Sequence, residues 1–524
     1  MRLPSLAAAL LLALAAAALT PHWVHADEFG PHPLLQRYQI ANDAYRAAQG
    51  EDPGPARTAH MRQAAELYRA ALDEAPQSHL APEAAFMGAA AFSEAGDLAG
   101  ALAILSVFVR GYGDAALLET LKNGDKKVSP PIPADPKQLA ERTRFLATAY
   151  QQIASDQLAT FDLRGAAATF AEAADNAWLE TSARRDFAWN AVRLAYAFGE
   201  LPLLKTAHEK LVQLKPTPEA LAEADYLLAA QESADDDSDE PLSQYYKTNH
   251  KSAAAGPFIV RAAARLADRQ AKLADRTTWC DKAVSAFDKL GAEGKTNAEL
   301  LELAAGCAYR NLDLEISQKF APLDGQRSYP KQASELIKAF EEDLKSVGVW
   351  VEKLERFQAA YPSTVFAAIA WAREASLFDA CQKGLDARPV QYNSEADERL
   401  LNRVDVAGDD RVLNEARARQ AKQREEWRAN RERLVAASVP QAVKRYARAV
   451  LTGRAASPEH PAILHSLGRL AYFTSRLGNG EMGSIPKEPD FGYHDDAYLL
   501  VWPTKLLPRA EECLPDPLPA VLER

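Results

Sequence analysis

Apolar residues recur along most of this chain at intervals of three and four, which is the period of an amphipathic helix. The clearest segment covers residues 64–76, where Ala64, Tyr68 and Ala71 share one helical face and Pro76 follows. Small residues let two helix axes approach closely, the aromatic ring fills the groove between them, and proline ends the helix. Few segments alternate as strands do. The pattern therefore predicts an all-α chain of helical hairpins separated by short Gly, Pro or Asp breaks.

Later segments repeat parts of this pattern. Ala64 and Ala101 are 37 residues apart, and Ala166 and Leu204 are 38 residues apart. These segments resemble the tetratricopeptide-repeat family, and the resemblance covers residues 27–232. It implies a right-handed superhelix, or solenoid, of TPR-like hairpins. The residues expected to pack the repeats are Ala64, Tyr68, Ala71, Pro76, Phe92, Gly96, Ala101, Ala166, Phe170, Ala173, Gly199 and Pro216.

Two positions depart from the repeat pattern. Leu204 stands where alanine is usual, and His208 stands where an aromatic residue is usual. A general α-hairpin solenoid therefore remains an alternative. A second helical-repeat block is expected over residues 242–390. Within it, Phe357, Tyr361 and Trp371 resemble the repeat of periplasmic Tol–Pal-associated and outer-membrane-assembly helical proteins.

The first 26 residues predict a secretory signal peptide. Arg2 is followed by an apolar run over residues 3–19, and residues 24–26 read Val-His-Ala before Asp27. A membrane anchor is the alternative, but the apolar run is short for a span and no basic flank follows it. The remaining sequence holds no second apolar run long enough to span a bilayer. We expect an exported protein, periplasmic or secreted.

Other segments depart from the repeats. Residues 233–241 read SADDDSDEP and predict an exposed acidic linker. A charged helical region is expected over residues 391–476, with helices over 410–436, 438–452 and 459–476. The first of these is either a solvated helix with internal ion pairs or a docking face for an anionic partner. Prolines and glycines predict an irregular tail over residues 477–524.

Charge and cysteine content restrict the function. The formal net charge of −11 argues against a nucleic-acid partner, which favours a basic surface. Cys280 and Cys307 should face each other across a helical hairpin that turns near residues 293–294, so a disulfide between them is predicted. Two buried thiols are the alternative. Nothing in the spacing requires Cys381 and Cys513 to pair.

The sequence carries no recognisable catalytic motif. It lacks a zinc-binding His-Glu-x-x-His helix, a nucleophile elbow, a phosphate-binding glycine loop and a Cys-x-x-Cys pair. Two clusters, around His460 and His465 and around His494, are better explained by helix capping and turn chemistry than by a metal or a catalytic site. A lytic transglycosylase would need a globular catalytic domain that the tail is too short to form. We expect no enzyme activity, no cofactor and no metal.

The sequence as a whole predicts an exported TPR-like scaffold for protein–protein interactions. Its partner would be a protein of a bacterial envelope machine, serving outer-membrane assembly, polysaccharide export, a Tol–Pal-like system or surface motility. A periplasmic solute- or glycan-binding repeat protein is the alternative. An envelope enzyme without a recognisable motif is the third.

Overall fold

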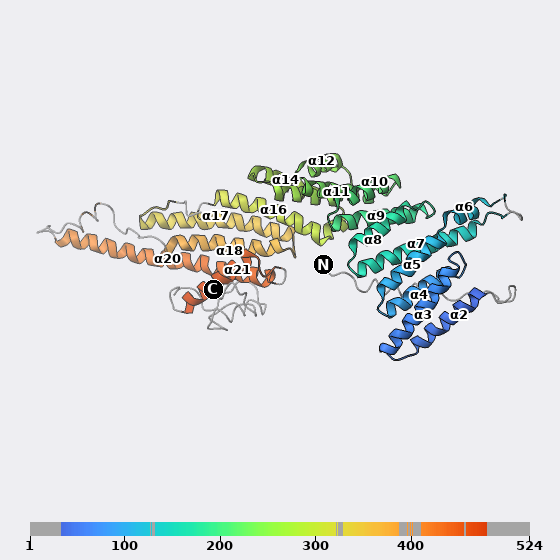
Figure 1. Ribbon diagram of the computed structural model, residues 1–524. Helices are drawn as coiled ribbons and strands as arrows, with labels where there is room; N and C mark the ends of the chain where they lie inside the picture. The colour runs from blue at the N-terminus through green and yellow to red at the C-terminus, as the bar shows by residue number, and fades with distance from the viewer. Residues whose placement is uncertain are drawn as a thin grey trace. The chain divides into compact units, whose positions relative to one another are not determined.

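The computed structural model describes residues 33–478, apart from 126, 128–131, 321, 323–327, 387–395, 397–398, 400, 402–409 and 455–456. The predicted signal peptide (1–26), nearly all of the predicted tail, Cys513 and His494 lie outside these residues. The regular elements within them are helices, so the all-α prediction is confirmed (Figure 1). The chain divides into two compact units, residues 1–232 (unit 1) and 233–524 (unit 2).

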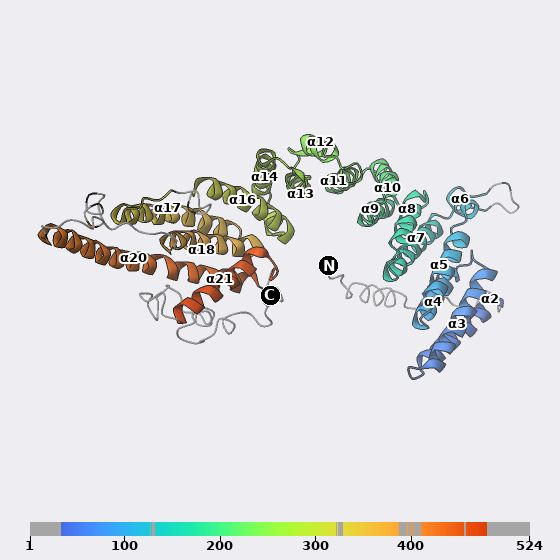
Figure 2. The same ribbon diagram turned by 60° about the vertical axis from the view of Figure 1, so that its left-hand side comes forward.

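Unit 1 is a stack of TPR-like helical hairpins, as the sequence predicts. Helices that follow one another in sequence pack side by side, α2 on α3, α3 on α4, α4 on α5, and then α7 to α10 in the same way (Figure 2). Its helices are α2 (Pro33–Gln49), α3 (Pro55–Glu74), α4 (Ala81–Glu94), α5 (Leu98–Tyr112), α6 (Ala115–Asn123), α7 (Pro136–Ala159), α8 (Leu163–Asp175), α9 (Thr181–Ala197), α10 (Leu201–Gln213) and α11 (Pro218–Asp235).

Small residues bring these helices close together. A Cβ added at Gly88 of α4 would lie 2.4 Å from Ile104 Cδ1 and 3.0 Å from Tyr68 Cβ, so only glycine fits between α3 and α5. Tyr68 is fully buried and its ring packs 5.8 Å from that of Tyr38, centroid to centroid. The hairpins are therefore held by close backbone approach and by aromatic rings that fill the grooves.

Unit 2 is built from longer helices. Helix α17 packs along α18, α18 along α20, and α20 along α21 (Figure 2). The helices are α12 (Glu240–Asn249), α13 (Gly256–Arg269), α14 (Leu273–Asp288), α15 (Ala292–Thr296), α16 (Ala298–Lys319), α17 (Ala333–Ala360), α18 (Val365–Asp386), α20 (Asp410–Gly453) and α21 (Pro461–Gly478).

Helix α20 corrects one prediction. The sequence suggested separate helices over 410–436 and 438–452, but the structure has one 44-residue helix with Pro440 inside it. Proline removes one backbone hydrogen bond from a helix. Here Val439, Val443 and Tyr446 are buried in the core that also contains Ala375 of α18, and this packing holds the helix together across the proline.

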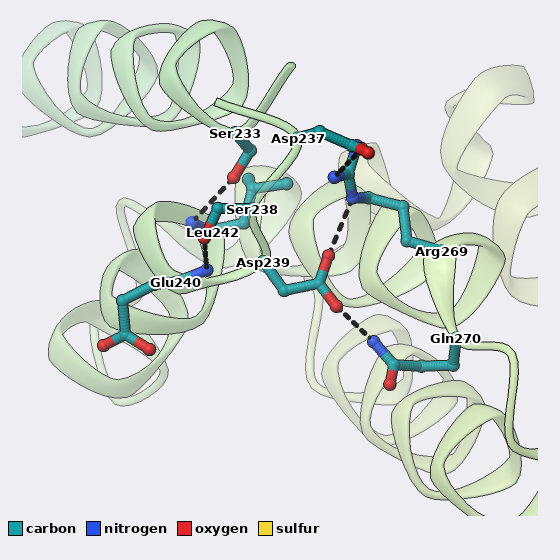
Figure 3. A network of polar contacts seen from close by, with 8 residues as sticks. All are labelled: Ser233, Asp237, Ser238, Asp239, Glu240, Leu242, Arg269 and Gln270. Carbon is teal, nitrogen blue, oxygen red and sulfur yellow. Dashed lines mark hydrogen bonds and ion pairs between the residues drawn. The ribbon is translucent and has the colours of Figure 1, made fainter. Parts of the chain in front are cut away.

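The acidic segment 233–241 is not a free linker, although the boundary between the two units falls at its start. Figure 3 shows Arg269 reaching Asp239 (Nε to Oδ1, 2.7 Å) and Asp237 (Nη2 to Oδ1, 2.8 Å), while Gln270 donates to Asp239. The hydroxyl of Ser233, still within α11, accepts a hydrogen bond from the N–H of Leu242. Crowded carboxylates repel one another, and here the Arg269 guanidinium of α13 pairs with two of them, Asp237 and Asp239.

Candidate interaction surfaces

Helix α9, the first helix of one hairpin in unit 1, carries an exposed basic side chain beside a half-buried aromatic one. Trp189 and Arg193 lie one turn apart on α9, and the Arg193 guanidinium carbon is 3.7 Å from the centroid of the Trp189 ring. The same guanidinium makes two bonds to Glu223 of α11, from Nε to Oε1 at 2.8 Å and from Nη2 to Oε2 at 3.0 Å. An arginine that stacks on one side chain and pairs bidentately with another is held in one orientation.

The indole of Trp189 carries an unused hydrogen-bond donor. Its Nε1 is buried and has no acceptor in the described part of the chain. Tryptophan and arginine are the residues most enriched among those that dominate binding energy at protein interfaces. We call Trp189, Arg193 and Glu223 the α9–α11 array.

A small pocket lies among α8, α9 and α10. Its cavity is about 180 Å³, and the Lys210–Asp175 ion pair lies at its edge. Sites for small molecules occupy roughly 300–1,000 Å³, so this pocket has room for a single side chain. Alanines from the three helices line it: Ala171, Ala174, Ala188, Ala191 and Ala207.

The predicted repeat-packing residues lie in the interior and at the turns of unit 1. Gly96 and Gly199 have φ values of 73° and 77°. Pro76 and Pro216 follow the ends of α3 and α10. The others are buried, namely Ala64, Tyr68, Ala71, Phe92, Ala101, Ala166, Phe170 and Ala173.

The two departures from the repeat pattern also have structural roles. Leu204 is fully buried, so it fills space where alanine would leave a gap. His208 Nε2 lies 2.7 Å from Asp225 Oδ1 and so connects α10 with α11. A phenylalanine at this position would only pack, whereas histidine adds a directed polar contact.

Cys280 of α14 and Cys307 of α16 meet in one buried cluster with Ala263 and Ala283. Both are free thiols in the structure, so the predicted disulfide is not formed there and stays a prediction. Their hydrogen bond lowers the pKa of Cys280 and, together with burial, raises that of Cys307. The facing helices therefore bring the two sulfurs together.

The sequence analysis missed two buried carboxylates on α18. Glu374 is fully buried; Arg445 Nε of α20 lies 2.7 Å from its Oε2, and Gln358 donates to its Oε1 at 2.9 Å. Burial raises the pKa of Glu374 to about 7, although Arg445 opposes this. Asp379 accepts from Arg469 Nη2 at 2.7 Å and from the Tyr446 hydroxyl at 3.0 Å. Both partners come from distant parts of the chain, which explains why no local pattern signals them.

The charged half of α20 carries side-chain ion pairs. Arg411 Nε lies 3.2 Å from Glu415 Oε1, and Arg433 pairs with Glu341 of α17. Ala416 and Trp427 on the same helix are buried. The helix therefore carries the expected internal ion pairs but also packs against α17 and buries two side chains, and the anionic-partner alternative stays a prediction.

The histidine cluster near the start of α21 makes ordinary contacts. His460 Nδ1 accepts a hydrogen bond from the Ala462 N–H at 3.2 Å, and His465 lies against the Tyr446 ring. The residues with a described position include no group of three or more His, Cys, Asp or Glu side chains arranged to hold a metal ion. Across those same residues, no single helix is long and apolar enough to cross a membrane, and α5 with α6 meet the length and composition requirements only as a pair bent by 44°.

Solved structures similar to this chain include two distant helical-repeat matches. No family model matches the sequence, and no curated protein matches it. A crystal structure of the P58(IPK) TPR domain aligns at 15% identity, covering 75% of this chain and 99% of that one, with a TM-score of 0.18. A circular tandem repeat protein with novel repeat topology aligns at 12% identity over 86% and 85% of the two chains, with a TM-score of 0.15. Such TM-scores support no argument, so the TPR-like description rests on the hairpins themselves.

Proposed function

We propose that this protein is an exported helical-repeat scaffold that binds a protein partner through the first-helix side of unit 1. The observation that carries the proposal is the α9–α11 array. It exposes the Arg193 guanidinium, which stacks on the half-buried Trp189 ring and pairs with Glu223 of α11, while the Trp189 N–H itself is buried. A surface of this kind suits a protein better than a small molecule, because stacked hairpins offer an extended face.

The cellular setting is part of the proposal. The signal-peptide pattern of residues 1–26 supports export. The similarity of residues 353–382 to periplasmic repeat proteins supports an envelope partner. The candidate systems are outer-membrane assembly, polysaccharide export, a Tol–Pal-like system and surface motility.

Crosslinking in the cells that make the protein tests this function. A photo-crosslinking residue is placed at Arg193, and a matched one at Val212, an exposed position on α10 outside the pocket. The expected result is a defined envelope protein at position 193 and little at position 212. Trp189→Ala should then weaken the affinity of the purified pair by roughly 30-fold, the loss typical of a dominant interface residue. Equal labelling at both positions, or no envelope protein, would overturn the proposal.

One contact favours the glycan-binding alternative. The Tyr246 and Trp279 rings of unit 2 lie 5.2 Å apart, centroid to centroid, in an edge-to-face arrangement. However, Lys282 Nζ is 3.6 Å from the centroid of the Trp279 ring and occupies one of its faces. A glycan site would raise the melting temperature when envelope oligosaccharides are added, and Trp279→Ala would abolish that rise.

A further inference from the structure

Three hairpin turns of unit 1 close in the same way. Each of the helices α4, α7 and α9 is followed by a residue with positive φ. The backbone N–H of the next residue then donates to the carbonyl oxygen five positions before it, which is the Schellman arrangement. The three residues with positive φ are Gly96 (73°), Phe161 (60°) and Gly199 (77°). The backbone bonds are Asp97 N–H to Phe92 O (2.8 Å), Asp162 N–H to Gln157 O (2.8 Å) and Glu200 N–H to Ala195 O (3.1 Å).

Phe161 is the exception among these turns. The left-handed conformation strains an L-residue and leaves glycine unstrained, and the chain uses glycine at the two equivalent positions. Lys215, Asp237 and Ser363 also have positive φ, but their side chains are polar, whereas that of Phe161 is apolar. The Phe161 side chain does little to offset this strain, because the residue is 80% exposed. The backbone hydrogen bonds of the turn hold Phe161 in this conformation, and residues held in strained conformations cluster at functional sites. The Phe161 ring is therefore presented outward at a conformational cost.

The surroundings of Phe161 indicate what it would contact. Asp162 follows it directly and caps α8 by accepting from the Gly165 N–H at 2.8 Å. Arg164, the nearest cation in sequence, lies 3.2 Å from Glu200 of the next turn. An exposed aromatic ring beside carboxylates complements an apolar pocket with a basic rim.

We propose that Phe161 is an anchor that inserts into an apolar pocket, rimmed by lysine or arginine, on the protein partner of unit 1. This inference rests on the proposed scaffold function and adds a second contact point to it, at the turn edge of the hairpin stack. The phenyl ring supplies buried apolar area, and Asp162 supplies the charge that orients it.

Thermal unfolding tests whether the ring serves the fold. Phe161→Gly relieves the backbone strain and should raise the unfolding midpoint by roughly 2–4 °C in a domain of this size. Phe161→Ala removes the ring but keeps the strain, so its midpoint should not rise. A lower midpoint for Phe161→Gly would show that the ring supports the hairpin and would overturn the proposal.

Affinity for the partner recovered by crosslinking at Arg193 tests the anchor itself. We expect Phe161→Gly to weaken binding at least tenfold, Phe161→Trp to retain it, and Ile40→Ser, at another exposed apolar residue, to leave it unchanged. A photo-crosslinking residue at 161 should label an apolar pocket flanked by lysine or arginine. If Phe161→Gly binds the partner with unchanged affinity while Trp189→Ala binds it more weakly, Phe161 is not an anchor and the proposed scaffold function stands. Recovery of no partner at either position overturns both.

Discussion

Units 1 and 2 are both helical, yet they are stabilised differently. In unit 1, hairpins that are neighbours in sequence pack through buried alanines, glycines and aromatic rings. In unit 2, buried ion pairs join long helices whose paired residues are far apart in sequence, 71 positions for Glu374 with Arg445 and 90 for Asp379 with Arg469. Unit 1 also has a buried cation, Arg142, which donates to the backbone oxygens of Tyr112 and Gln77. The two units therefore differ in what their buried cations meet, backbone carbonyls in unit 1 and carboxylates in unit 2.

A physical reason for the difference lies in helix length. Two long helices with broad apolar faces can pack in several registers that bury similar areas. A buried carboxylate with one cation within reach can pair with it in only one of those registers. The other registers would leave a buried charge unpaired, which costs free energy. We infer that Glu374 and Asp379 select the register of α18 against α20 and α21.

The largest expected effect is on the aromatic packing of unit 1. Tyr68→Ala removes a fully buried ring and should lower the free energy of unfolding by roughly 4 kcal/mol. Hydrogen–deuterium exchange resolved by peptide should show faster exchange in residues 33–123 and little change in α17 to α21. Tyr68→Phe, which keeps the ring, is the control. If hydrogen exchange became faster by the same factor in both units, the two units would not be stabilised separately.

The thiol pair offers the next largest effect, in unit 2. Oxidation of Cys280 and Cys307 should stabilise the fold by roughly 3.5 kcal/mol in the chain-entropy model for a loop of this length. The measurement is urea unfolding of oxidised and reduced protein, with Cys307→Ser as the control that cannot form the bridge. Detection of Cys280 as a free thiol in a non-reduced peptide map of the exported protein would rule the bridge out.

Glu374 predicts a pH dependence in unit 2. Its folded-state pKa of about 7 lies above its ordinary value, so the folded protein holds this proton more tightly than the unfolded chain does. Its stabilising contribution is therefore complete below about pH 4.5 and is lost as pH rises through 7, a change of roughly 3 kcal/mol. Glu374→Gln imitates the protonated form, so the loss should disappear.

The test compares urea unfolding of the wild type and Glu374→Gln at pH 5 and pH 8. The variant should equal the wild type near pH 5 and exceed it at pH 8. Arg445→Leu should be less stable than the wild type at pH 8, because it leaves the buried carboxylate without its cation. A Glu374→Gln variant that is less stable at pH 8 would show that the ion pair outweighs burial.

Sequence reasoning identified the parts of the fold that depend on local pattern. Tyr68 and Gly96 belong to periodic or turn motifs, and such motifs can be read from a single chain. The continuity of α20 across Pro440 could not be read in this way, because it depends on packing against α18. The α9–α11 array was missed for the same reason. Arg193 and Glu223 are ordinary surface charges until two helices bring them together.

The smallest expected effect comes from replacing two glycines whose backbone conformations differ. Gly96 has φ of +73° and Gly348 lies inside α17, and a Cβ added to either would meet no atom within 4 Å. Gly96→Ala should therefore cost about 1 kcal/mol through left-handed backbone strain alone. Gly348→Ala should instead stabilise by about 1 kcal/mol through helix propensity. Urea unfolding should give shifts of opposite sign. A Gly96→Ala variant at least as stable as the wild type would mean that the turns of unit 1 do not depend on glycine, which would also remove the strain argument for Phe161.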